Sequence, residues 1–159
     1  MSCAHSIRTR CTPSTRTPPG SISGQVAARN LHHVGVAVAD LDAAVARYER
    51  LFGAELEQRE TVPDQGVEAV SMRVGQGRVE LLGSLGPETP VGKFLASRGP
   101  GMHHVAFEVD DVGAELARLA GDGAELIDAA PRRGAFGLEV AFVHPDATGG
   151  VLAELVGRA

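Results

Sequence analysis

The alternation of apolar and polar positions predicts the same order of elements in each half of the chain. Residues 31–39 form an apolar, β-prone run, and over 41–52 the apolar positions recur every three to four residues, which is typical of an amphipathic helix. Three further strand-like runs, separated by turn sequences, follow at 54–62, 67–74 and 78–82. The first half, about residues 30–83, therefore predicts a βαβββ module.

The second half, residues 101–159, repeats this pattern. A strand, a helix, a further strand, a loop and two final strands are expected at 102–109, 111–120, 124–128, 129–137, 138–144 and 150–156. Between the halves, residues 84–100 contain three prolines and predict a linker with a short helix at 91–98. The chain therefore predicts an α+β fold built from one βαβββ module used twice.

A few residues mark the expected helix ends. Asp40 precedes the first helix and the pair Asp110-Asp111 precedes the second, where an aspartate side chain can accept a hydrogen bond from a free backbone N–H group. Gly53 follows the first helix, at a position where the left-handed backbone conformation favours glycine. Both modules are thus expected to turn from strand to helix through an aspartate.

The two modules also repeat a set of histidines and glutamates. His33 and His104 are the second members of two His–His pairs that open equivalent strands, 71 residues apart. Glu80 and Glu154 lie in the final apolar run of each module, 74 residues apart. A glutamate among Val and Leu is rarely buried without a partner, which favours a functional role over a solvated one. A single histidine of this kind would more often be an ordinary strand-edge residue.

Composition and charge argue against two kinds of partner, nucleic acids and membranes. At 159 residues the chain suits one domain, or two small halves that share a core. All 20 acidic residues lie from Asp40 onward, where they face 11 basic residues, so this part carries a net charge of about −9. Such a surface argues against a nucleic-acid partner. No run approaches the roughly 18 apolar residues of a membrane span, so no membrane partner is expected either.

Residues 1–29 are expected to form a disordered tail before the folded domain of residues 30–159. The tail is rich in Ser, Thr, Pro and Arg, lacks acidic residues and contains Cys3 and Cys11, the only cysteines of the chain. Its composition resembles a transit peptide, which would direct the protein to an organelle matrix. The favoured alternative is an upstream extension of a bacterial chain, which predicts a cytoplasmic protein.

The motifs resemble the vicinal oxygen chelate, or glyoxalase-like, superfamily, and within it the methylmalonyl-CoA epimerase family. The segments that carry the likeness are Leu31–Val36, Asp64–Val67, Val79–Leu82, Gly101–Ala106, Pro131–Gly137 and Phe142–Leu155. The resemblance implies that the two modules form one cup-shaped mixed sheet with a divalent metal where they meet. It assigns His33, Glu80, His104 and Glu154 as ligands, leaves Co, Mn, Zn, Ni or Mg open, and implies a homodimer by analogy.

The same resemblance implies an epimerase that acts on a 2-carboxyacyl-CoA, with methylmalonyl-CoA as the leading candidate. The metal would polarise the thioester carbonyl, and acid/base groups would remove and return the α-proton. Glu154 is one candidate acid/base. Several family members have a catalytic Glu two residues after a Gly-Val pair, where this chain has Ala69 and the nearest acid is Glu68. Because one residue changes the face of a strand, Glu68 is a second candidate whose side chain is expected to point away.

Several other activities are also compatible with the sequence. The same scaffold supports glyoxalase-type isomerisation, ring-cleaving dioxygenation, thiol transfer to an antibiotic, and antibiotic binding without catalysis, and a fold alone does not separate them. Gln65 is a candidate substrate contact, and Lys93, Arg132 and Arg133 are candidates for the phosphates of CoA. The alternative for these three basic residues is ordinary solvated charge.

Overall fold

The structure is a computed structural model that describes residues 28–158, and its elements follow the predicted order. The first module and the linker contain β1 (Asn30–Val38), α1 (Leu41–Phe52), β2 (Glu55–Val62), the 3-10 turn η1 (Pro63–Gln65), β3 (Val67–Val74), β4 (Gly77–Ser84) and α2 (Pro90–Arg98). The second module contains β5 (Gly101–Glu108), α3 (Val112–Gly121), β6 (Arg132–Arg133), the 3-10 turn η2 (Ala135–Gly137), β7 (Leu138–Val143), α4 (Pro145–Thr148) and β8 (Ala153–Arg158).

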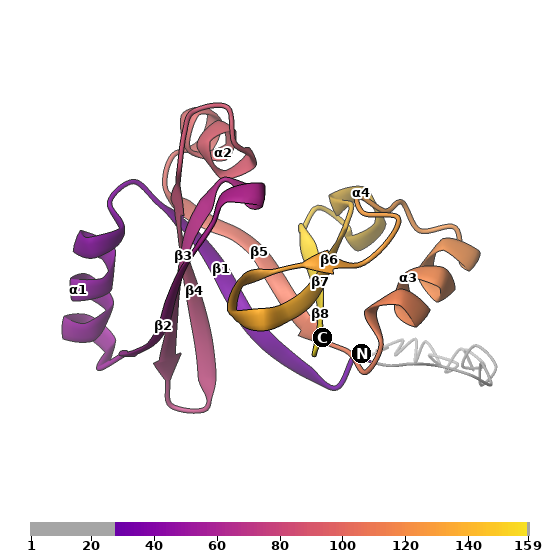
Figure 1. Cartoon of the computed structure of the whole chain (residues 1–159), viewed down its shortest axis with the longest axis horizontal. Coiled ribbons are helices and arrows are strands. Elements are labelled where there is room, and N and C mark those ends of the chain that lie inside the picture. The colour runs from indigo at the N-terminus through magenta and orange to yellow at the C-terminus, as the bar shows by residue number, and fades with distance from the viewer. Residues whose placement is uncertain (1–27, 159) are drawn as a thin grey trace, which may run out of the picture.

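All strands belong to one eight-stranded mixed sheet in the order β2-β3-β4-β1-β5-β8-β7-β6. Within each module the first and last strands pair in parallel, β1 with β4 and β5 with β8. The modules join where β1 and β5 pair in antiparallel fashion, in the middle of the sheet (Figure 1). The first and last strands of both modules therefore meet around one central seam.

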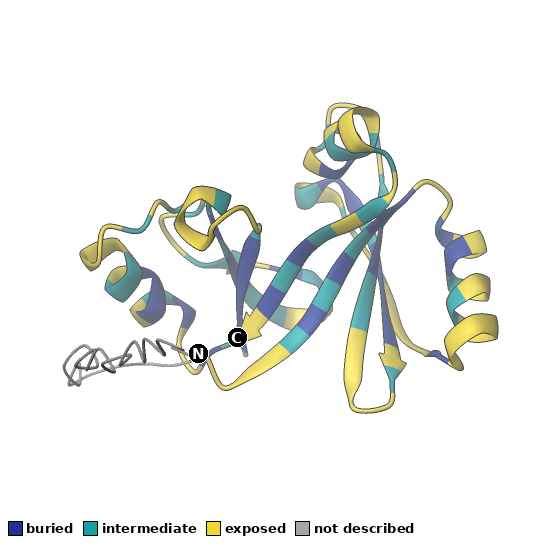
Figure 2. Ribbon diagram, turned by 180° about the vertical axis from the view of Figure 1, so that it is seen from behind, coloured by how far each residue is buried: buried dark blue, intermediate teal, exposed yellow. Residues whose placement is uncertain are grey.

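The helices α1 and α3 cover the outer face of the sheet at its two flanks (Figure 1). Asp40 accepts a hydrogen bond from the Ala43 N–H group and Asp111 from the Ala114 N–H group, as predicted for N-caps. Gly53 ends α1 in the left-handed conformation. Each helix then buries its apolar stripe against the sheet, α1 over Met72 and its neighbours and α3 over the second module (Figure 2).

The inner face of the sheet is covered by α2 and by residues 131–137, which we call the crossing loop. This loop starts from the second module and reaches the first, where the Gln65 side chain donates to the Arg133 carbonyl oxygen at 2.8 Å. The Phe136 N–H group donates to the Glu60 carboxylate at 2.5 Å. Phe136 is the one residue other than glycine with positive φ, at 60°, among residues 28–158. The inner face is thus closed by contacts between modules.

The strand predicted at 124–128 is wrong. This segment forms an isolated bridge between Leu126 and Val143 and three backbone hydrogen bonds with Phe142 and His144, but no continuous strand, and a two-residue strand, β6, forms later. Side-chain bonding explains the difference, because the Asp128 carboxylate accepts the Phe142 N–H group at 2.8 Å and so takes the place of a strand partner. The last strand also begins at Ala153 rather than at residue 150.

The N-terminal boundary can be judged only from residue 28 onward. Arg29, which the sequence assigns to the end of the tail, donates to the Asp110 carboxylate at 2.6 Å, and its N–H group donates to the Glu108 carbonyl oxygen. The folded part therefore includes Arg29, and the rest of the predicted tail lies outside the described residues. Within residues 28–158, no helix is long and apolar enough to cross a bilayer.

Candidate metal centre and active site

Strand register brings the two His–Glu pairs into equivalent positions. In the first module Glu80 of β4 pairs with Gly35, two residues after His33. In the second module Glu154 of β8 pairs with Ala106, two residues after His104. Because side chains two residues apart share a face of a strand, each histidine and its glutamate project from the inner face.

The seam between β1 and β5 then brings the two pairs together. His33 pairs with Ala106 and His104 with Gly35 across this seam, so the two rings meet over it. Their Nε2 atoms are 3.0 Å apart. The Glu154 carboxylate lies 3.3 Å from Nε2 of His33 and 3.5 Å from Nε2 of His104. The Glu80 carboxylate lies 3.4 and 3.7 Å from the same two atoms.

The preceding histidine of each pair fixes the orientation of its neighbour. The Nδ1 atoms of His32 and His33 are 2.8 Å apart, and those of His103 and His104 are 3.0 Å apart. One nitrogen of each pair must donate and the other accept, which leaves Nε2 of both central rings directed at the carboxylates. A second group bonded to the far nitrogen is the usual way in which proteins hold a metal-binding imidazole.

Gly35 provides the space that the His104 ring occupies. A Cβ atom at this position would lie 2.2 Å from Cε1 of His104, closer than any side-chain contact allows. On its other side the ring meets Phe142 edge to face, with centroids 5.5 Å apart. His104 is therefore held between the bare backbone of Gly35 and the ring of Phe142, two neighbours that no local sequence pattern marks as part of the site.

Burial and charge act on these groups in opposite directions. Burial opposes protonation of His33, but hydrogen bonds and attraction from Glu154 and Glu80 outweigh it and raise the pKa of His33 to about 9. Burial likewise opposes ionisation of Glu154, yet the bonds from His104 and His33 lower its pKa to about 2. In the metal-free protein the site is a buried ion pair, and His33 carries a proton at neutral pH.

Two observations indicate that these residues fit a divalent metal ion. Within residues 28–158, Oε2 of Glu154 is buried and lies 3.3 and 3.5 Å from the Nε2 atoms of His33 and His104 without a well-formed hydrogen bond, a contact that a cation between these groups would complete. One donor atom from each of His33, His104 and Glu154 lies within 4.8 Å of the others, and Glu80 adds a second carboxylate. Two imidazoles and two carboxylates suit borderline and hard divalent ions.

The ligand cluster lines a small cavity of about 80 Å³ on the inner face. The walls include two of the predicted substrate contacts, Gln65 and Arg132. Arg132 bonds to Asp128 at 3.2 Å, and its guanidinium lies 5.3 Å from the centroid of Phe142. Ala69 also lines this cavity, as its position on the same face of β3 as Val67 predicts.

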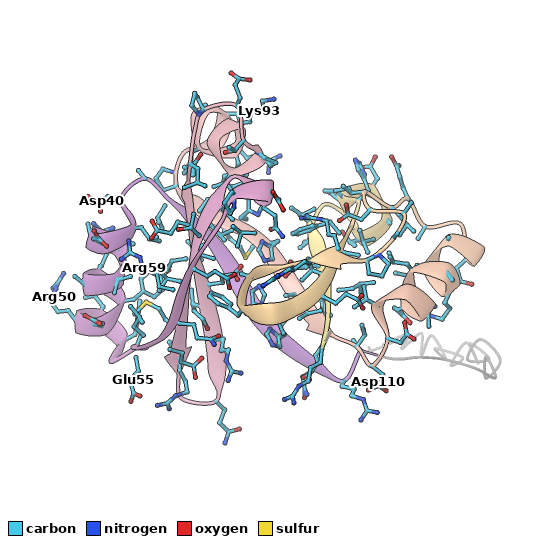
Figure 3. The ribbon with its side chains drawn as sticks, in the orientation of Figure 1. Asp40, Arg50, Glu55, Arg59, Lys93 and Asp110 are labelled. Carbon is cyan, nitrogen blue, oxygen red and sulfur yellow. The ribbon has the colours of Figure 1, made fainter. Side chains whose placement is uncertain are left out.

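The other predicted residues lie outside this cavity. Lys93 of α2 is 3.6 Å from Glu88 and projects at the outer end of the molecule (Figure 3). The Arg133 side chain is exposed, and only its carbonyl group takes part in the crossing loop contact. Glu68 lies on the other face of β3, where its carboxylate is 2.7 Å from Arg59, and Arg59 also bonds to Asp42 of α1 (Arg59 is labelled in Figure 3).

Comparison with known proteins agrees with this geometry. The model of the Glyoxalase/Bleomycin resistance protein/Dioxygenase superfamily matches residues 32–142. Mitochondrial methylmalonyl-CoA epimerase from Homo sapiens is 36% identical over 144 residues, which are 89% of this chain and 82% of the relative. The chain belongs to the methylmalonyl-CoA epimerase family of this superfamily.

The similarity to two further members of the methylmalonyl-CoA epimerase family extends over nearly the whole length of those proteins. Ethylmalonyl-CoA/methylmalonyl-CoA epimerase from Cereibacter sphaeroides is 39% identical over 127 residues, which are 79% of this chain and 95% of the relative. Methylmalonyl-CoA epimerase from Streptomyces coelicolor in complex with 2-nitronate-propionyl-CoA has a TM-score of 0.81 at 34% identity and covers 84% of this chain and 96% of that one. The predicted cup-shaped glyoxalase-like fold is confirmed.

Proposed function

We propose that this protein is a metal-dependent epimerase that interconverts the two epimers of methylmalonyl-CoA. The observation that supports it most is the buried His–Glu cluster shared by the two modules, in a chain with epimerase relatives along most of its length. The Streptomyces coelicolor relative holds 2-nitronate-propionyl-CoA. A nitronate is a planar anion with its charge on two oxygens, the electronic form of the enediolate that loss of an α-proton produces.

We assign His33, Glu80, His104 and Glu154 as the residues that would hold a divalent ion. Such an ion would supply Lewis-acid polarisation of the thioester carbonyl and of the charge that develops on it. The ligand set favours no single one of Co, Mn, Zn, Ni and Mg. The fixed imidazole orientations and the buried carboxylates present the four donors without rearrangement of the sheet, which limits the entropy lost on binding.

The proton transfers require groups on two sides of the α-carbon. Ala69 cannot serve, and Glu68 faces Arg59 on the other face of the sheet. The carboxylates that line the ligand cavity belong to Glu80 and Glu154, which reach it from different modules. We therefore propose that Glu154 and Glu80 share the acid and base roles, and that Gln65 and Arg132 contact the acyl group.

Isotope exchange tests this function directly. The metal-loaded protein, incubated with one epimer of methylmalonyl-CoA in deuterated water, should incorporate deuterium at the α-carbon and form the other epimer. Ethylmalonyl-CoA and acetyl-CoA are the comparison substrates, and protein treated with a chelator is the control. Absence of exchange with every metal of the panel would rule the proposal out.

Two coarser expectations accompany this proposal. A homodimer is proposed by analogy with the family, and sedimentation velocity on the purified chain should then give a mass twice that of one chain. The cytoplasm is the proposed compartment, with an organelle matrix as the alternative if residues 1–27 direct import. Fractionation of cells that express the full chain, compared with a chain begun at Ala28, separates these two.

A further inference from the structure

A second, larger cavity of about 430 Å³ opens on the inner face, beside the ligand cluster. Its walls include Gln58, Ser71, Arg78, Leu138 and Arg158. Leu138 lines both cavities, so they adjoin at the crossing loop. The larger cavity lies toward the start of β4 and the end of β8, whereas α2 covers the opposite end of the inner face. The ligand cluster therefore lies between α2 and this cavity.

Two arginines project into this cavity from the strands that carry the glutamate ligands. Arg78 is two residues before Glu80 on β4, and Arg158 is four residues after Glu154 on β8. Even spacing along a strand places each arginine on the same face as its glutamate. On β8 the face alternates as expected, because Val156 lines the cavity and a Cβ atom on Gly157 would contact Val112 on the outer face.

Of the two arginines in this cavity, only Arg158 has a guanidinium group that is not bonded to a carboxylate within the described residues. Arg78 bonds to Glu57 at 2.9 Å, and Glu108, on the cavity wall, accepts a hydrogen bond from the Asn30 amide. Arg158 is exposed at the end of β8 and has no ion pair within the described part of the chain. An exposed guanidinium with unused donors is suited to a phosphate, which it can bind through two parallel hydrogen bonds.

We propose that this cavity receives the phosphates of the acyl-CoA, with Arg158 as the main contact and Arg78 as the second. The inference rests on the proposed epimerase function. Arg158 lies four positions after Glu154 on β8, which is about 13 Å along the strand. The pantetheine chain, which joins the thioester to the first phosphate, covers such a span when extended. The thioester then lies at the ligand cluster while the phosphates reach the two arginines.

This assignment replaces the basic residues that the sequence suggested. Arg132 is engaged by Asp128 and Phe142 within the ligand cavity, too close to the reacting end of the substrate. Lys93 lies beside Glu88 and lines a different cavity, shared with Arg98 and His104, at the α2 end of the inner face. Arg133 turns its side chain to solvent and contributes only a backbone contact to the crossing loop.

A truncated substrate separates phosphate recognition from the chemistry. Methylmalonyl-pantetheine keeps the thioester and the carboxylate but has no phosphate. In Arg158→Gln, KM for methylmalonyl-CoA should rise about tenfold, which equals about 1.4 kcal/mol and is the scale of one charged hydrogen bond. The kcat should stay within about twofold, and kcat/KM for methylmalonyl-pantetheine should not change. Arg78→Gln should show the same pattern with a smaller effect, because Glu57 already occupies this arginine.

Arg50→Gln is the matched control, since it removes the same charge from α1, where the side chain points away from both cavities (Figure 3). Equal losses for both substrates in Arg158→Gln, or no loss for either, would overturn the phosphate assignment. Calorimetry with CoA itself, which needs no turnover, separates the two proposals. Tenfold weaker CoA binding in Arg158→Gln, in a protein without epimerase activity, would support the subsite and refute the reaction.

Discussion

The two modules place their proposed metal-binding His–Glu pairs in the same way and differ mainly in their outer strands. In each, a parallel pair of strands places a glutamate opposite the second residue after a histidine, Glu80 opposite Gly35 and Glu154 opposite Ala106. The first module completes its sheet with the full-length strands β2 and β3. The second module keeps only an isolated bridge and the short β6 at this place, and uses the crossing loop instead.

This difference separates what the metal requires from what the substrate requires. The ligand-bearing strands keep one register because a change of one residue would turn a donor to the outer face. The outer strand of the second module carries no ligand, so its residues are free to form a loop. That loop contacts the first module through Gln65 and Glu60, and it contributes Ala135 to the ligand cavity and Phe136 to the larger cavity.

The largest effect is expected from Glu154→Gln, compared with Glu80→Gln. Both changes remove an anionic ligand with little change in volume. Metal affinity should fall at least about tenfold in each, and turnover should fall about 10²–10⁴-fold where an acid/base group is also lost. Glu154→Gln should be the more damaging, because Oε2 of Glu154 is the buried atom without a hydrogen-bond partner. Metal titration and deuterium exchange measure the two quantities.

Glu115→Gln provides a control for the burial of these carboxylates. Glu115 is also buried in the second module, but it bonds to Arg118 and lies on α3, away from the cluster. This variant should lose stability without loss of metal affinity. Unchanged metal content in Glu154→Gln would contradict the ligand assignment.

A smaller but local effect is expected from Gly35→Ala. The new methyl group would overlap the His104 ring, so the ring must turn away from the cluster and metal affinity should fall about 10–100-fold. Gly83→Ala is the matched control, because a Cβ atom there meets Leu41 at an ordinary 3.5 Å. Metal titration of both variants, with melting temperature as a check on folding, tests the point. Equal behaviour of the two would refute the role given to Gly35.

The metal-free protein should lose stability as the pH rises from about 6.5 to 9. His33 has a folded-state pKa of about 9 against an ordinary 6.5, so its contribution is complete below pH 6.5 and disappears by about pH 9. Glu154, with a pKa of about 2 against 4.5, loses its contribution only as the pH falls below 4.5. His103, whose pKa is lowered to about 4 by burial and by the neighbouring His104 imidazole, opposes folding only below pH 6.5.

Scanning calorimetry with and without a chelator checks this dependence. The melting temperature of the metal-free protein should fall by about 10 °C over the interval from pH 6.5 to 9. The metal-loaded protein should show the opposite slope, since a metal needs deprotonated imidazoles and binds more tightly as the pH rises. Parallel curves for the two forms would show that His33 does not exchange a proton for the metal.

The smallest effect is expected from Glu68→Gln. Because Glu68 pairs with Arg59 on the outer face, turnover should stay within about twofold and stability should change by about 0–1 kcal/mol, as for other partly exposed ion pairs. Metal content should not change. A fall in turnover of about 10²–10⁴-fold would instead identify Glu68 as a base and would require it to turn through the sheet.

Residues with strong local signals could be predicted from the sequence. Aspartates before each helix, among them Asp40 and Asp111, predicted where the helices begin. The repeat spacing of His33 and His104 predicted that the two histidines meet where the modules join. Alternation along β3 also predicted that Ala69 faces the cavity while Glu68 does not. These features depend on neighbours within a few residues or on an internal repeat.

The remaining features depend on contacts that no local pattern encodes. Asp128 replaces a strand partner by bonding to Phe142, and Phe136 adopts a positive φ while it donates to Glu60, 76 residues away. The apolar residues at 124–128 therefore predict a strand as long as the bond between Asp128 and Phe142 is unknown. The overlap of Gly35 with His104 also exists only once β1 and β5 are paired.

The connection at Gly99 and Pro100 lies between α2 and β5, where the chain could be divided without cutting a strand. Each fragment would then keep one parallel pair of strands with one histidine and one glutamate, and the β1–β5 seam would be the surface on which they reassociate. A divalent metal ion would stabilise the association of the two fragments, since neither fragment alone offers more than two of the four proposed ligands. Fused to the halves of a reporter enzyme, they would make a sensor whose signal follows the free metal concentration.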